Sequence, residues 1–263
     1  LAIDLAENLS KEQKIYSLGP LIHNEDEIKR LNELGVDILG ELSNDPKRPI
    51  LIRSHGVGKE VYDFLEENNI PYVDATCPFV KKIHDYVKEY LEKGYDIAIL
   101  GDKNHPEVQG IISWGQGKIH VFGDMEAVKA YSYPHEHFLL LAQTTLPKAF
   151  FDEAKAYVES RTNAVCINTI CSATKKRQEA AMLLAKEVDL MLVIGGKDSN
   201  NTKKLVELCR NVNPNTLHIE NSSEINVQKL RNYAIIGISA GASTPKWVID
   251  EVLEVLQNER YKE

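Results

Sequence analysis

Short apolar runs of strand length recur along this chain, and each is followed by a polar or glycine-containing loop and then by a helical pattern. Continuous apolarity, without alternation with polar residues, is typical of parallel strands that are covered on both faces. The alternation of strands and helices predicts an α/β fold with mainly parallel sheets and right-handed crossovers. The runs are Pro49–Ile52, Tyr72–Ala75, Asp96–Leu100, Phe138–Ala142, Ala164–Ile167, Leu190–Ile194 and Ala234–Ile238.

Helices are expected where apolar residues recur with a period near 3.6, over Val80–Lys93, Thr174–Lys186 and Pro245–Gln257. A further amphipathic pattern covers Leu1–Leu9 at the start of the chain. Because no cap or strand precedes this pattern, we expect a further upstream segment of roughly 10–20 residues.

The charge balance excludes some classes of partner. The chain has 31 Lys and Arg residues against 39 Asp and Glu residues, a formal net charge of −8. An acidic chain is a poor ligand for duplex nucleic acid and for anionic membrane surfaces. No run approaches the roughly 18 apolar residues that a membrane span requires. With 4 cysteines in 263 residues there is no disulfide framework, so a cytoplasmic location is expected.

The polar residues that could carry chemistry lie just after the predicted strands. In parallel α/β sheets, ligands bind beyond the carboxyl ends of the strands, where helix N-termini also point. We therefore expect one composite pocket. The loops that would build it are Ser54-His55-Gly56, Thr76-Cys77-Pro78, His105-Pro106-Glu107, Gln143-Thr144-Thr145, Cys171-Ser172, Gly195–Asn201 and Ser239–Ser243.

The cysteines divide into two pairs. Cys166 lies in an apolar strand and Cys209 on the apolar stripe of a helix, so both are interpreted as buried packing residues. Cys77 precedes Pro78, a favoured first helical residue, so its sulfur is placed at a helix N-terminus, where a thiolate is stabilised. Cys171 occupies the equivalent place before another helix. The second pair is interpreted as metal ligands brought together by the fold, or as one nucleophile with a bystander.

Three of the eight histidines, His23, His55 and His105, stand in loops with polar neighbours. Imidazole, hydroxyl, amide and helix N-terminal N–H groups can together hold a diphosphate without a cluster of Lys or Arg. The Gly195–Asn201 loop lacks the G-K-[ST] of a nucleoside triphosphate site, and no G-x-G-x-x-G follows a strand. Glu107, directly behind Pro106, is a candidate proton donor.

Taken together and in order, these loops resemble those of the 4-hydroxy-3-methylbut-2-enyl diphosphate reductases, iron–sulfur enzymes of the methylerythritol phosphate route of isoprene biosynthesis. The resemblance implies three small α/β domains in a pseudo-threefold trefoil around a central site, here 1–77, 78–168 and 169–263. It implies a metal-binding oxidoreductase that removes the allylic hydroxyl of an isoprenoid diphosphate at a [4Fe–4S] cluster, fed by a one-electron donor such as ferredoxin or flavodoxin. The stretches that carry it are Ile22-His23-Asn24, Ser54–Val57, Asp74–Pro78, His105–Val108, Gln143–Leu146, Cys171–Thr174 with Arg177–Ala180, and Ala240–Ser243.

The resemblance also implies roles for single residues. Cys77 and Cys171 resemble two of the family's three cluster ligands, and Glu107 with Thr144 resembles its proton relay, beside His105. The substrate ligands it implies are His23, His55, His105, Thr144, Ser199, Asn200, Asn201 and Ser243.

Two positions depart from the family pattern. Asn200 stands where the family usually has a second serine, and the family's first cluster cysteine lies in a Phe-Cys-x-Gly-Val segment that would precede Leu1. The second departure leaves open a cluster-free diphosphate- or anion-binding module. A third function, a hydrolase or transferase that uses Cys77 as its nucleophile, would need an activating base near the thiol.

Overall fold

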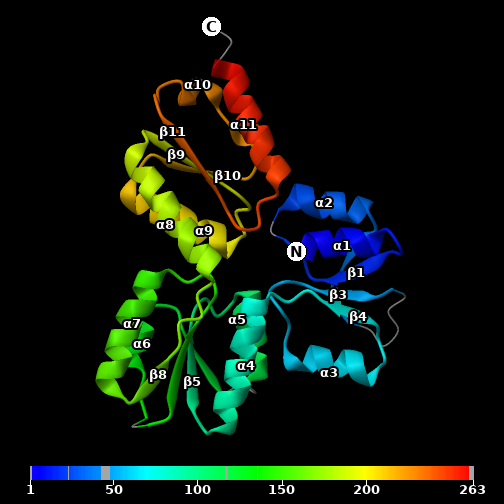
Figure 1. The fold of residues 1–263 in the computed structure, drawn as a ribbon, viewed down its shortest axis with the longest axis vertical. Coiled ribbons are helices and arrows are strands. Elements are labelled where there is room, and N and C mark those ends of the chain that lie inside the picture. The colour runs from blue at the N-terminus through cyan, green and yellow to red at the C-terminus, as the bar shows by residue number, and fades with distance from the viewer. Residues whose placement is uncertain (1, 23, 43–47, 116–117, 135, 261–263) are drawn as a thin grey trace. The chain divides into compact units, whose positions relative to one another are not determined.

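The computed structural model describes residues 2–22, 24–42, 48–115, 118–134 and 136–260, and it confirms the predicted α/β class (Figure 1). Strands within these ranges pair in parallel and form three separate sheets. Three small parallel sheets agree with the three small α/β domains that the resemblance implies.

The first sheet has the strand order β2-β1-β3-β4. Ala6 and Leu31 pack with Leu51 on one face of it, and Leu65 packs with Ile52 on the other. Both faces are therefore covered, as the unbroken apolar run of β3 predicts. The elements of this part are α1 (Ala2–Ser10), β1 (Ile15–Leu18), α2 (Glu25–Glu33), β2 (Val36–Leu39), β3 (Ile50–Ile52), α3 (Lys59–Glu67) and β4 (Tyr72–Asp74).

The second sheet has the order β6-β5-β7-β8. Its central strand places Ile97 and Ile99 against α4 and α5, and Ala98 and Leu100 against α6 and α7, because successive strand side chains point to opposite faces. The elements are α4 (Pro78–Glu92), β5 (Asp96–Leu100), α5 (Pro106–Trp114), β6 (Ile119–Phe122), α6 (Met125–Ala130), β7 (Phe138–Ala142), α7 (Lys148–Arg161) and β8 (Ala164–Cys166).

The third sheet has the order β10-β9-β11. Met191 and Val193 pack against α8 and α9, and Ile194 packs against Val248 of α11. The elements are α8 (Ser172–Glu187), β9 (Leu190–Ile194), α9 (Asn200–Val212), β10 (Thr216–Ile219), the short helix η1 (Ser222–Glu224), α10 (Val227–Leu230), β11 (Ile236–Ala240) and α11 (Lys246–Arg260).

The chain divides into two compact units, one of Leu1–Leu21 with Arg30–Cys171 and one of Ile22–Lys29 with Ser172–Glu263. The first unit holds the first two sheets and the second unit holds the third sheet. The domain boundaries after residues 77 and 168 stay predictions.

The two packing cysteines are where the sequence places them. Cys209 is fully buried in α9, and Cys166 is half-buried in β8. Burial raises the pKa of each thiol to about 11, so both are protonated at neutral pH.

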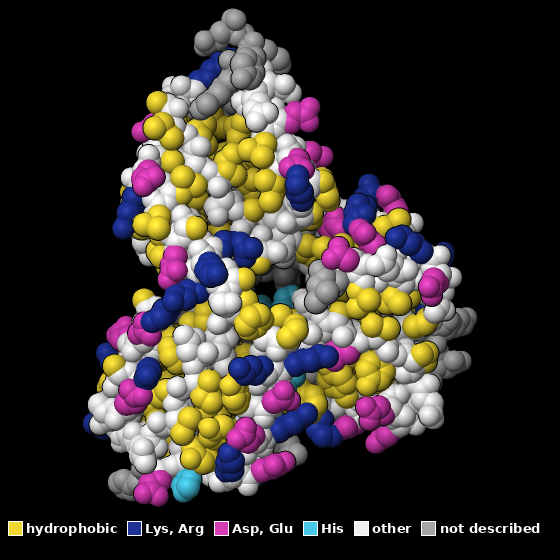
Figure 2. Space-filling view, in the orientation of Figure 1, with side chains coloured by type: hydrophobic (Ala, Val, Ile, Leu, Met, Phe, Trp, Pro, Cys, Tyr) yellow, Lys and Arg dark blue, Asp and Glu magenta, His cyan; other side chains and the backbone are white. Residues whose placement is uncertain are grey.

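Acidic and basic side chains are interspersed over the face shown in Figure 2. Among the described helices, none has the length and apolarity needed to cross a bilayer.

A buried histidine between α4 and α5 predicts acid sensitivity. His84 is 4% exposed and its ring stacks on Trp114. Burial lowers the pKa of His84 to about 4; Lys88 and Lys81 act in the same direction and Asp74 against it. The unfolded chain takes up this proton near pH 6.5 and the folded chain only near pH 4. Neutral His84 therefore contributes its full share to the free energy of unfolding above pH 6.5. This contribution, about 3 kcal/mol, is lost as the pH falls towards 4.

Urea unfolding of the native chain and of His84→Gln, at steps between pH 7 and pH 4, measures this loss. We expect the native chain to lose more stability than the variant over that range. His120→Gln, at a partly exposed position of β6, is the matched control. Equal pH dependence in the native chain and His84→Gln would contradict the assignment.

Candidate functional site

Two histidines of the predicted site meet in the first unit. His105 is the N-cap of α5, and its Nδ1 accepts a hydrogen bond from the backbone N–H of Glu107 at 3.2 Å. The ring of His55, in the loop after β3, lies edge-on to that of His105, with centroids 5.3 Å apart. Accepting at Nδ1 leaves Nε2 of His105 as the protonated nitrogen, which can donate to an anion.

Glu107 and Thr144 are both buried and are joined by two hydrogen bonds. Their side chains are 2% and 7% exposed. The backbone N–H of Thr144 donates to Oε1 of Glu107 at 2.8 Å, and the Thr144 hydroxyl donates to Oε2 at 2.7 Å. A carboxylate held at both oxygens has a fixed orientation, and the hydroxyl between it and the site can pass a proton on.

The two cysteines at strand-to-helix junctions each donate a backbone hydrogen bond to a neighbouring site loop. Cys77 is the N-cap of α4 with Pro78 at the first helical position, as predicted, and its N–H donates to the carbonyl of Ser54 at 2.9 Å. Cys171 directly precedes α8, and its N–H donates to the carbonyl of Thr144 at 2.9 Å. Both thiols are half-buried.

These contacts join the predicted residues of the first unit into one group. Ser54 connects Cys77 to the loop of His55, and Thr144 connects Cys171 to Glu107. No set of three or more His, Cys, Asp or Glu side chains arranged to hold a metal ion occurs among the described residues. A shared cavity between Cys77 and Cys171 stays a prediction.

Polar donors gather in the second unit at the N-terminus of α9. Ser199 caps the helix, its hydroxyl oxygen accepting from the N–H of Thr202 at 3.3 Å. Asn200 and Asn201 form the first turn, and the buried Nδ2 of Asn201 has no hydrogen-bond partner among the described residues. Ser243 lies in the loop between β11 and α11. Free N–H groups at a helix N-terminus favour an anion.

The loops after β9 and β11 pass so close to Thr202 that each has a glycine at the point of contact, Gly195 and Gly241. A Cβ at Gly241 would lie 2.2 Å from Oγ1 of Thr202, and one at Gly195, whose φ is +148°, would lie 2.8 Å from it. The Thr202 hydroxyl is fully buried and has no partner among the described residues. Sequence analysis missed Thr202, because Ser199-Asn200-Asn201-Thr202 lacks the Glu or Gln that would complete a capping box.

Sequence analysis also left Gln143 without a role. Its side chain is fully buried; Oε1 accepts from the N–H of Asp102 at 3.1 Å, and Nε2 has no partner among the described residues. Its place directly before Thr144 is the signal that could have found it. His23 lies outside the described residues.

A protein-family model described as LytB protein matches residues 1–257. This chain belongs to the LytB family. The LytB chain is similar to curated proteins named 4-hydroxy-3-methylbut-2-enyl diphosphate reductase. It is 46% identical to that of Alkaliphilus oremlandii, covering 93% of this chain and 88% of the relative. It is 44% identical to that of Caldanaerobacter subterraneus subsp. tengcongensis, covering 95% and 88%.

Solved structures agree with the LytB fold. One, of (E)-4-hydroxy-3-methyl-but-2-enyl diphosphate reductase, described as the terminal enzyme of the non-mevalonate pathway, is 41% identical with a TM-score of 0.70 and covers 98% of this chain and 93% of its own. The corresponding reductase of Plasmodium falciparum is 27% identical with a TM-score of 0.90, covering 98% and 83%. The resemblance stated from the loop motifs is therefore confirmed.

Proposed function

We propose that this LytB chain catalyses the reductive dehydroxylation of 4-hydroxy-3-methylbut-2-enyl diphosphate to isopentenyl and dimethylallyl diphosphates. The reaction breaks the C–O bond of the allylic hydroxyl and forms a C–H bond. It consumes two electrons and two protons and releases one water. The names of its relatives at 44–46% identity support this assignment.

The Glu107–Thr144 pair is the observation that carries the proposal. Loss of a hydroxyl as water needs a proton at its oxygen, and a positioned carboxyl group with a hydroxyl relay delivers one. With Glu107 protonated at Oε2, its hydrogen bond with the Thr144 hydroxyl runs from Glu107 to Thr144, and Thr144 can pass its own proton to the substrate hydroxyl as it receives that of Glu107. His105 lies beside this pair, with its Nδ1 fixed by Glu107.

The diphosphate would be held by neutral donors from several loops. His55 and His105 present imidazoles, and Ser199, Asn200 and Asn201 present hydroxyl, amide and helix N–H groups. The predicted ligands Thr144, Ser243 and His23 complete the set. Hydrogen bonds to anions of this kind are about twice as strong as neutral ones, which removes the need for a basic cluster in an acidic chain.

Cys77 and Cys171 fit as ligands of a [4Fe–4S] cluster. Both are half-buried thiols at helix starts, and each is linked through a backbone hydrogen bond to a loop that carries a proposed substrate-binding residue. Cys166 and Cys209 do not fit, because they pack against the apolar cores of the second and third sheets. A cluster bound there would supply electrons and a Lewis-acidic iron. The proposed source of electrons is a cytoplasmic ferredoxin or flavodoxin.

The full-length protein, purified and reconstituted without oxygen, tests the proposal. We expect bound iron and sulfide, a broad absorbance near about 400 nm, and formation of both diphosphate products when reduced viologen is the electron source. Diphosphate binding by a protein without iron and without turnover would support a cluster-free anion-binding module instead.

A further inference from the structure

The loop that carries His55 is held between α4 and α5 by two aromatic rings. Nε1 of Trp114, at the end of α5, donates to the carbonyl of Val57 at 3.1 Å. The ring of His84, in α4, stacks on Trp114 with centroids 5.2 Å apart and planes inclined by 29°. Lys88, also in α4, places its Nζ 3.9 Å from the centre of the Trp114 ring on which His84 stacks.

The loop backbone lies directly against the His84 ring at Gly56. Gly56 has a φ of +73°, and a Cβ there would lie 3.1 Å from Cε1 of His84 and 3.1 Å from Cγ2 of Thr76. Only glycine adopts this conformation at little cost and also leaves room for the imidazole. The residues on each side of His55 are therefore fixed: Ser54 by Cys77, and Gly56 with Val57 by the two rings.

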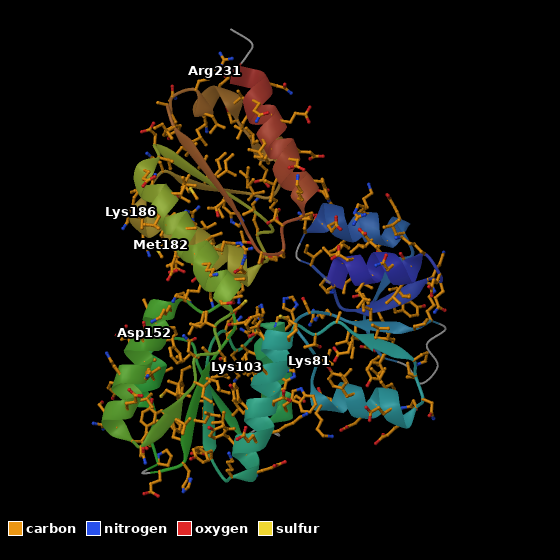
Figure 3. The ribbon with its side chains drawn as sticks, viewed as in Figure 1. Lys81, Lys103, Asp152, Met182, Lys186 and Arg231 are labelled. Atoms are coloured by element: carbon orange, nitrogen blue, oxygen red, sulfur yellow. The ribbon has the colours of Figure 1, made fainter. Side chains whose placement is uncertain are left out.

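The same two helices begin at residues of the candidate site. Cys77 is the N-cap of α4 and His105 is the N-cap of α5. Lys81, one turn into α4 and labelled in Figure 3, pairs with Asp74 of β4 at 2.7 Å and anchors this end of the helix to the first sheet. The stacking of His84 on Trp114 joins α4 to α5, and the hydrogen bond from Trp114 to Val57 connects the His55 loop to the same two helices.

We propose that Trp114 and His84 are positioning residues that hold the His55 imidazole in its edge-on place beside the His105 ring. The inference rests on the proposed function, because it takes His55 as a ligand of the diphosphate. Trp114 and His84 act through the loop backbone and touch neither Glu107 nor Thr144 in any contact that the structure records. They should therefore control diphosphate affinity and leave the proton relay unchanged.

The test combines Trp114→Phe with His55→Ala. Phenylalanine keeps a stacking ring but removes the N–H that holds Val57. We expect Trp114→Phe to weaken binding of inorganic diphosphate about five- to tenfold, the effect of one lost hydrogen bond. KM should rise by the same factor, while kcat and iron content stay within about twofold.

His84→Leu, which removes the stacked ring at similar volume, should also weaken diphosphate binding. Calorimetric titration with inorganic diphosphate gives the affinity without turnover.

A double-variant cycle separates action through His55 from general loosening. If Trp114 acts through His55, the double variant binds diphosphate no more weakly than His55→Ala alone. Tyr131→Phe is the control, since it removes from the same unit a hydrogen bond of an aromatic side chain, that of the Tyr131 hydroxyl to Asp96 at 3.1 Å, outside the His55 loop; it should leave the affinity unchanged. The inference is overturned if the losses of diphosphate affinity in Trp114→Phe and His55→Ala add up in the double variant. It is also overturned if both Trp114→Phe and His84→Leu bind diphosphate as tightly as the native chain. Unchanged affinity in His55→Ala would instead contradict the proposed function.

Discussion

If Cys77 is a ligand of the proposed cluster, replacing it with alanine should prevent iron incorporation and reduce turnover by on the order of 1,000-fold or more. A metal centre that stabilises developing charge is worth several kcal/mol, and each 1.36 kcal/mol is about tenfold in rate. Because Cys77 caps α4 through its backbone and its side chain makes no capping hydrogen bond, the helix should form normally in the variant. Iron and sulfide analysis, the absorbance near about 400 nm and single-substrate kinetics measure the loss.

Cys166→Ala is the matched control, because it removes a half-buried thiol of the same unit that lies in β8. It should keep its iron content. Cys171→Ala should behave as Cys77→Ala does. Full iron content in either site variant would show that the thiol is not a cluster ligand.

Glu107→Gln should lower kcat by at least about 100-fold and leave substrate affinity almost unchanged. Glutamine occupies the same space and can still accept from the N–H of Thr144, but it has no carboxylic proton to deliver to the hydroxyl of Thr144. Positioned acid–base groups contribute about 10²–10⁴-fold in rate. Steady-state kinetics and calorimetric titration with the substrate separate the two effects.

Glu126→Gln, on the exposed first turn of α6, controls for the loss of one negative charge. It should leave kcat and affinity unchanged. Weakened binding with unchanged kcat in Glu107→Gln would assign Glu107 to substrate binding and remove it from proton transfer.

Among the described strands, four of the five inner ones and three of the six edge ones could be predicted from the sequence. Asp96–Leu100, Phe138–Ala142 and Leu190–Ile194 have the predicted bounds, because a strand buried on both faces must be apolar throughout. The edge strands β2, β6 and β10 were missed, since Asp37, His120 and His218 interrupt their apolar runs. The edge strands β4, β8 and β11 were predicted. β1 lies inside the first sheet, but Ser17 interrupts its pattern.

The candidate site could be predicted as a set of loops but not as a set of contacts. The order of motifs in the chain was sufficient to select His55, His105, Glu107, Thr144 and Cys171. Which side chain meets which depends on how parallel strands far apart in the sequence lie side by side. The pair of Glu107 with Thr144 joins the first turn of α5 to the loop after β7, and no local pattern links residues 37 positions apart.

The sequence alone determined the α/β class, most of the inner strands and the loops where the chemistry gathers, because strand burial and helix capping are local demands on residue type. Only the tertiary structure decided that His84 and Trp114 hold the His55 loop, and that Thr202 fills the space left by two glycines. A histidine and a tryptophan in amphipathic helices have the same local pattern whether they pack in a core or support a site. The difference lies in what folds against them, which is a property of the neighbouring loops and helices.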